Sequence, residues 1–99
     1  MVVARLTKFY FKEGKREEGF TELDLILNKE ARSAMGFRGY VSMFSCDEDN
    51  VAVILTMWED DESFVNSKKI FSLAVEKVTP LLEKQPNPQH LRVDTVNFS

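Results

Sequence analysis

The chain has 99 residues, and its thirteen basic and sixteen acidic side chains give a net charge of −3. This length predicts one domain over residues 1–99, and the acidic balance argues against nucleic acid as a partner. The single cysteine excludes an intrachain disulfide and a cysteine-based metal site. The lack of a signal-peptide pattern or a long apolar run predicts a cytoplasmic protein with no membrane partner.

The first half of the chain predicts a strand, a helix and a second strand. Residues 2–11 are rich in β-branched and aromatic side chains and contain no breaker, which is typical of a strand. Apolar side chains then recur every three or four residues over 15–35, which predicts an amphipathic helix that Gly36 terminates. Residues 37–46 predict a strand for the same reason as residues 2–11 do.

The second half predicts a strand, a helix and a last strand. Residues 47–50 form a polar turn, so the strand predicted over 51–58 is an antiparallel neighbour of the strand before it. Asp60 or Asp61 is placed to cap a helix over 62–84, which we expect to bend or break near 68–69 and to kink or tighten at Pro80. A proline-rich loop over 85–89 and a strand over 91–98 complete the order β-α-β-β-α-β. This order is typical of the ferredoxin-like α+β fold, with a four-stranded antiparallel sheet.

Both faces of the predicted sheet are apolar. In the third strand one face carries Val51, Val53 and Leu55, and the other carries Ile54 and Trp58. Helices can cover only one of these faces, and an exposed apolar face of that size favours aggregation. We therefore expect a homodimer in which two sheets pack face to face through Val51, Val53 and Leu55. The alternative is that the long side chains of Arg5 and Arg92 lie over this face.

The chain resembles the antibiotic biosynthesis monooxygenase-like family of the dimeric α+β barrel superfamily in three segments, MGFRGYVSMF, VAVILTMWEDDESFVNS and VTPLLEKQP. The shared features are a Gly-Phe-x-Gly-Tyr second strand, a third strand ending in Trp58, an acidic helix start and a Pro-Leu-Leu helix end. The resemblance spans nearly the whole chain. It implies a dimeric α+β barrel that acts as a monooxygenase on a small phenolic, quinol or polycyclic aromatic compound, without a bound cofactor or metal.

Two departures from this family argue against haem degradation. Members with a functional histidine on the second helix carry it about one helical span beyond the tryptophan, where this chain has Asn66, Ser67 and two lysines. Haem-degrading members also need an asparagine on the first strand, and residues 2–11 contain none.

A pocket between sheet and helices is the predicted substrate site, with Trp58 as its wall and Tyr40 as the polar handle for a phenolic hydroxyl. The full predicted set is Trp58, Tyr40, Phe9, Phe20, Phe64, Ser67 and Phe71. The same aromatic spacing is also compatible with plain core packing. The proton acceptor is not identified, because His90, the one histidine, lies beside the proline-rich loop and reads as a solvated residue.

Two other functions share the predicted fold. One is a non-catalytic, dimeric module that binds or senses a small molecule. The other is RNA binding, because RNA-recognition domains have the same strand and helix order. Residues 51–58 contain no basic residue and a single aromatic one, which argues against RNA. The identity of the substrate is left open.

Overall fold

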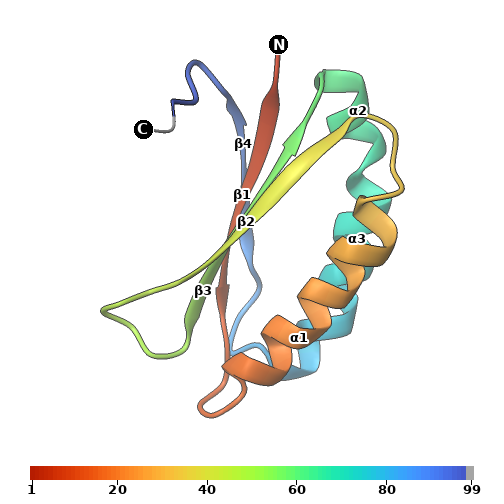
Figure 1. Ribbon diagram of the computed structural model, residues 1–99. Coiled ribbons are helices and arrows are strands. Elements are labelled where there is room, and N and C mark those ends of the chain that lie inside the picture. The colour runs from red at the N-terminus through yellow and green to blue at the C-terminus, as the bar shows by residue number, and fades with distance from the viewer. Residues whose placement is uncertain (98–99) are drawn as a thin grey trace.

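The computed structural model describes residues 1–97 and shows an antiparallel sheet with helices on one of its faces (Figure 1). Its four strands, in the spatial order β2-β3-β1-β4, are β1 (Val3–Tyr10), β2 (Phe37–Phe44), β3 (Val51–Trp58) and β4 (Asn87–Arg92). The central strands pair from Val3 opposite Trp58 to Tyr10 opposite Val51. The order and pairing confirm the predicted ferredoxin-like topology.

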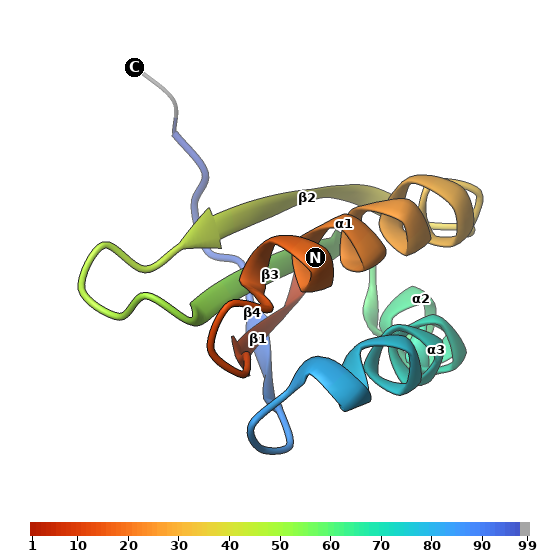
Figure 2. The same ribbon diagram turned by 90° about the horizontal axis from the view of Figure 1, so that it is seen from below.

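The helices form one layer against the sheet (Figure 2). α1 (Arg16–Ile26) continues into the π-helical turn η1 (Leu27–Ala31). α2 (Asp61–Asn66) is followed by α3 (Lys68–Val78) and the 3-10 turn η2 (Thr79–Leu81). α1 lies beside α3, and their buried side chains recur at the spacing that the sequence predicts: Phe20, Leu23, Leu27 and Ala31 from the first helix, Ala74 and Val78 from α3.

The predicted cap and break of the second helix are confirmed, but the predicted ends of both helices are wrong. α3 ends at Val78 and η2 at Leu81, short of the predicted end at residue 84. Asp60 is the cap of α2, because its Oδ1 accepts a hydrogen bond from the Ser63 amide at 2.8 Å. The predicted break falls at Ser67, between α2 and α3. The first helix ends at Ala31 and not at Met35, because the Ala34 amide turns back to the Ala31 carbonyl and Gly36 then adopts a φ of 81°.

The predicted bounds of the last strand are wrong. β4 spans Asn87–Arg92 and so begins inside the segment expected to be a loop, and residues 93–97 form no strand. Pro88 lies opposite Thr7 on an edge strand, where a missing amide hydrogen need not cost a hydrogen bond of the sheet. Pairing with β1 has thus overridden the local signal of two prolines. Phe98, the predicted end of this strand, lies outside the described residues.

The sheet has the two apolar faces that the sequence predicts. Trp58, Ile54 and Phe9 belong to the core between sheet and helices and are at most 5% exposed. On the other face Val53 and Leu55 are half-buried, and Val41 and Met43 are exposed. No helix of residues 1–97 covers that face (Figure 1).

The two arginines do not cover the open face, as the alternative expectation had it. Arg5 points between the sheet and the helices and is only 6% exposed. Arg92 reaches across to Asp61 at the start of α2. Val51, expected on the dimer face, is already buried within the chain.

Candidate functional site

A small cavity lies between the sheet and the helices, with a volume of about 40 Å³. β1, β3, the first helix and α3 all line it. Its walls are apolar apart from the side chains of Arg5, Thr7, Thr56 and Ser67. A cavity of this volume holds about three water molecules, so it is too small for an aromatic ring.

Trp58 forms one wall of this cavity and is itself held in place. Its Nε1 donates a hydrogen bond to Thr56 Oγ1 at 3.1 Å. Its ring packs against Phe37 in an edge-to-face arrangement with 5.3 Å between the centroids. Because the polar edge of Trp58 is satisfied by Thr56, the indole offers the cavity an apolar surface.

Arg5 brings a positive charge into this apolar site. Its Nη1 donates to Ser67 Oγ at 3.0 Å, and its Nη2 donates to the Phe64 carbonyl at 3.4 Å. The guanidinium carbon lies 4.3 Å from the centre of the Phe64 ring and 4.8 Å from that of Phe71. Both aromatic rings therefore support the cation. No carboxylate of residues 1–97 forms an ion pair with Arg5.

The break between α2 and α3 creates the partners of Arg5. Ser67 ends one helix and begins the next, so its hydroxyl lies beside the Phe64 carbonyl, which accepts from it. Burial lowers the pKa of the Arg5 guanidinium below its ordinary value, although the group stays charged at neutral pH. A desolvated cation without an anionic neighbour favours the binding of an anion.

A larger groove opens next to this cavity, between α3 and β4, with a volume of about 290 Å³. Arg5 and Phe71 line both hollows and so stand between them. The other residues that line the groove are Phe64, Lys68, Ser72, Pro88, Gln89 and His90. Its three ionisable side chains are all basic.

His90 lies on β4 and not in a loop. Its ring stacks on Phe64 with 3.9 Å between the centroids and 9° between the planes. Its Nε2 is 3.5 Å from Asp61 Oδ1, and Arg92 contacts the other oxygen of the same carboxylate at 3.3 Å. His90 is thus oriented at the mouth of the groove.

Four of the seven predicted site residues line the inner cavity: Trp58, Phe9, Ser67 and Phe71. Phe64 lines the groove beside them. The structure does not bring Tyr40 and Phe20 into either hollow. The Tyr40 hydroxyl donates to Asp24 Oδ1 at 3.4 Å and accepts from Asn28 at 3.2 Å, and Phe20 packs on Phe44. The Tyr40 hydroxyl is therefore bound by the first helix and lines neither hollow, so the structure gives no support to its predicted role as a polar handle.

Arg5 is the residue of this site that the sequence did not predict. The available signal was its position on the inward parity of the first strand, between Val3 and Thr7, both of which are buried.

Residues 1–97 contain no group of three or more His, Cys, Asp or Glu placed to hold a metal ion. None of their helices has the length and apolar character to cross a membrane.

Comparisons with known proteins place the chain in a fold class. No protein-family model matches the sequence, and no curated protein matches it either. A conserved protein from Methanosarcina mazei Go1 superposes with a TM-score of 0.83, at 16% identity over 95% of this chain and 94% of that chain. A protein of Caulobacter crescentus CB15, provisionally named an antibiotic biosynthesis monooxygenase, gives a TM-score of 0.82 at 14% identity over 95% and 91%.

A similarly named protein of Nitrosomonas europaea gives a TM-score of 0.79 at 11% identity over 90% and 86% of the two chains. The chain has the ferredoxin-like α+β fold, with a pocket between the sheet and the helices. It is the fold of the antibiotic biosynthesis monooxygenase-like proteins, which confirms the resemblance at the level of the fold.

Proposed function

We propose that the chain is a monooxygenase without a bound cofactor that acts on a small phenolic or quinol compound. The observation that carries this proposal is the buried guanidinium of Arg5, which lies without a carboxylate partner between two phenylalanine rings. A phenol must lose its proton before it can reduce dioxygen. A guanidinium beside the hydroxyl stabilises the resulting phenolate and lowers the pKa of the phenol.

The reaction needs no other reductant. The phenolate gives its electrons to dioxygen, one oxygen atom bonds to the ring carbon and becomes a quinone carbonyl, and the other leaves as water. The phenol supplies all four electrons and the hydrogen atoms of that water. The protein supplies orientation, a dry pocket and the charge of Arg5.

The volumes of the groove and the inner cavity suit different molecules. The groove has room for a compound of one or two rings, which favours these over larger polycyclic aromatics. The inner cavity beside Trp58 has room for dioxygen or water. Of the seven predicted binding residues we retain Trp58, Phe9, Phe64, Ser67 and Phe71, and we add Arg5.

Oxygen uptake with a panel of quinols and bicyclic phenols tests this function. We expect turnover by the natural chain and a loss of at least about tenfold in Arg5→Met and in Trp58→Phe, because one removes the charge and the other reshapes the cavity wall. Val65→Ala is the matched control, since Val65 is exposed on α2 and lines neither hollow. Absence of oxygen uptake across the whole panel would contradict the proposal.

The second candidate is a non-catalytic module that holds a small aromatic ligand. The observation in its favour is that Arg5, which cannot accept a proton at neutral pH, is the one ionisable residue lining the inner cavity. This module binds members of the same panel without consuming oxygen. Recovery of the ligand unchanged after incubation in air distinguishes it from the enzyme.

We also propose that two copies pack through the open face of the sheet. Val41, Met43 and Leu91 are 40 to 42% exposed there, beside the half-buried Val53 and Leu55. Contiguous apolar side chains of this kind mark an interface in a soluble protein. A two-fold axis would let each sheet cover the other.

A further inference from the structure

The groove between α3 and β4 combines aromatic walls with a cationic floor. Phe64 and Phe71 supply the walls from the helices, and Pro88 closes the side formed by β4. Arg5 reaches the groove from β1, the neighbouring strand, where it lies opposite His90. A flat apolar ring fits such walls, while an ion without a ring leaves them exposed to water.

The cationic side chains of the groove have hydrogen-bond donors that no described residue uses. A guanidinium carries five N–H donors, and Arg5 uses two of them on Ser67 and Phe64. Lys68 forms no hydrogen bond or ion pair through its side chain with any residue that the structure describes. No carboxylate of residues 1–97 lines the groove. The carboxylate of Asp61 lies against His90 and Arg92 and does not line the groove.

We propose that this groove binds an aromatic acid, whose carboxylate lies between Arg5 and Lys68 and whose ring lies along the apolar wall that Phe71 and Pro88 form. The carboxylate accepts from the free guanidinium donors, for which a planar bidentate partner is best suited. The inference rests on the proposed function only in making the substrate a hydroxylated ring. Binding itself requires no turnover.

A matched pair of ligands isolates the carboxylate. Titration calorimetry under nitrogen compares 1-hydroxy-2-naphthoate with 1-naphthol, which has the same hydroxylated ring system without the acid. We expect the acid to bind at least about tenfold more tightly, since one charge-assisted, partly buried hydrogen-bonded pair accounts for such a factor. Equal affinity, or tighter binding of naphthol, overturns the proposal.

Two neighbouring lysines provide the control variant. Lys68 lines the groove and Lys69 does not, although both are exposed at the start of α3. We expect Lys68→Gln to weaken the acid severalfold and to leave naphthol unchanged, while Lys69→Gln changes neither. Arg5→Met should abolish the preference for the acid. If Lys69→Gln weakens the acid as much as Lys68→Gln does, the effect is a general surface field and the site is not the one proposed.

Competition and oxygen uptake separate the remaining outcomes. Inorganic phosphate at the same concentration should displace little of the acid, because it cannot use the aromatic walls, and equal displacement would mean a simple anion patch. A preference for the acid with no oxygen uptake by any compound of the panel leaves the binding site standing and contradicts the monooxygenase. Turnover of naphthol with no preference for the acid supports the monooxygenase and contradicts the proposed site for the carboxylate.

Discussion

The guanidinium of Arg5 is buried without a negatively charged partner among the residues that the structure describes. It is 6% exposed, and its partners among the described residues are a hydroxyl, a carbonyl and two rings, none of which carries a negative charge. Replacing a buried charge by an apolar side chain of similar volume is often neutral or stabilising. A residue of this kind is therefore expected where it serves a ligand.

Arg5→Met separates stability from binding. We expect the free energy of unfolding to stay unchanged or to rise by about 1 kcal/mol, since the thioether still contacts Phe64 and Phe71. The affinity for aromatic acids falls at the same time. Urea unfolding measures the first effect and calorimetry the second. Arg5→Ala is the comparison, because the cavity that it leaves lowers stability by about 2 kcal/mol. A large loss of stability in Arg5→Met would assign this arginine to the fold alone.

Asp60, at the start of α2, makes a pH-dependent contribution to the stability of the folded state. Its hydrogen bonds from Ser63, first from the backbone amide, hold the pKa of the carboxyl below its ordinary value of 3.8. A carboxyl whose pKa is lower in the folded state stabilises it above the unfolded pKa, and this contribution is lost as the pH falls through the folded pKa.

The Asp60→Ala variant tests this contribution. The difference in Tm between it and the natural chain should be constant between about pH 5 and 7 and should shrink as the pH falls below 3.8, because the carboxylate is then protonated. Asp60→Asn, which keeps the cap without a charge, is the control and should show no such pH dependence. Thermal unfolding followed by circular dichroism at a series of pH values measures both. A difference in Tm that stays undiminished at low pH would mean that the charge of the carboxylate is not the source.

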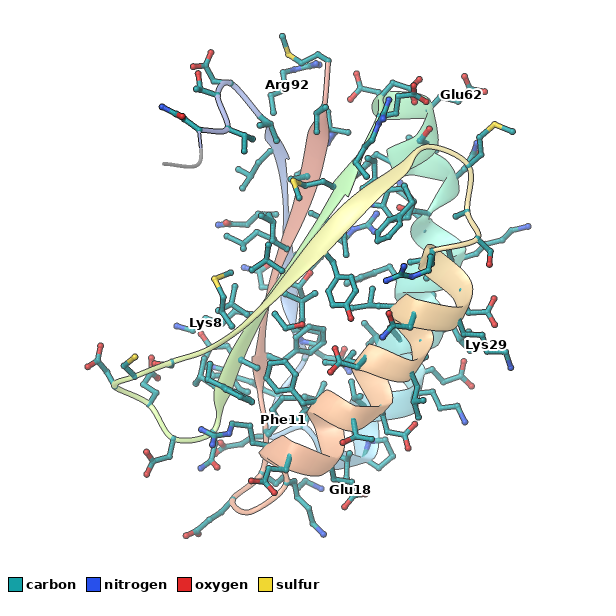
Figure 3. All side chains as sticks on the ribbon, viewed as in Figure 1. Lys8, Phe11, Glu18, Lys29, Glu62 and Arg92 are labelled. Carbon is teal, nitrogen blue, oxygen red and sulfur yellow. The ribbon has the colours of Figure 1, made fainter. Side chains whose placement is uncertain are left out.

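α1 contains a glycine that its packing requires. A Cβ at Gly19 would overlap the ring of Phe11, which is fully buried in the core (Figure 3). Helix propensity alone favours alanine at this position by about 1 kcal/mol. Overpacking costs about 1 to 3 kcal/mol and outweighs that gain.

We therefore expect Gly19→Ala to lower the free energy of unfolding by about 1 kcal/mol or more, measured by urea unfolding. Thr21→Ala, on the exposed side of the same helix, serves as the control and should be neutral or slightly stabilising. If Gly19→Ala proves more stable than the natural chain, the close contact with Phe11 does not exist in solution.

The elements show why some predictions held and others failed. β3 has the predicted bounds, 51–58, because a polar turn precedes it and an acidic helix start follows, so both of its ends have local signals. β4 has no such signals. It pairs with β1 through Pro88, and only the neighbouring strand makes this segment extended.

The candidate site was predictable only where a local signal in the sequence exists. Trp58, Phe9 and Phe71 are apolar at inward positions, and periodicity alone places them between sheet and helices. Periodicity does not tell whether an inward arginine has an acidic partner, so Arg5 was missed. It also does not tell which polar groups are already satisfied, so Tyr40 was assigned to a pocket although Asp24 and Asn28 bind its hydroxyl.

Over residues 1–97 the molecule is a sheet with helices on one side only (Figures 1 and 2). A chain this short buries a limited share of its surface, and association is a common way to gain stability. The open face includes β2 and β3, where Val41 lies opposite Leu55 and Met43 lies opposite Val53. Arg5 and Arg92 both point to the helices, so neither shields this face.

A lysine at the centre of the open face should break the proposed dimer. In a two-fold interface Leu55→Lys places two ammonium groups on the buried side, one from each copy. Their desolvation costs several kcal/mol, which weakens the dimer by at least about a hundredfold. The natural chain should sediment as a dimer at micromolar concentration, and the variant as a monomer. Val65→Lys is the control, because Val65 is 53% exposed on α2, on the helix side of the sheet, and should leave the dimer intact. A natural chain that sediments as a monomer would leave the open face without its proposed partner.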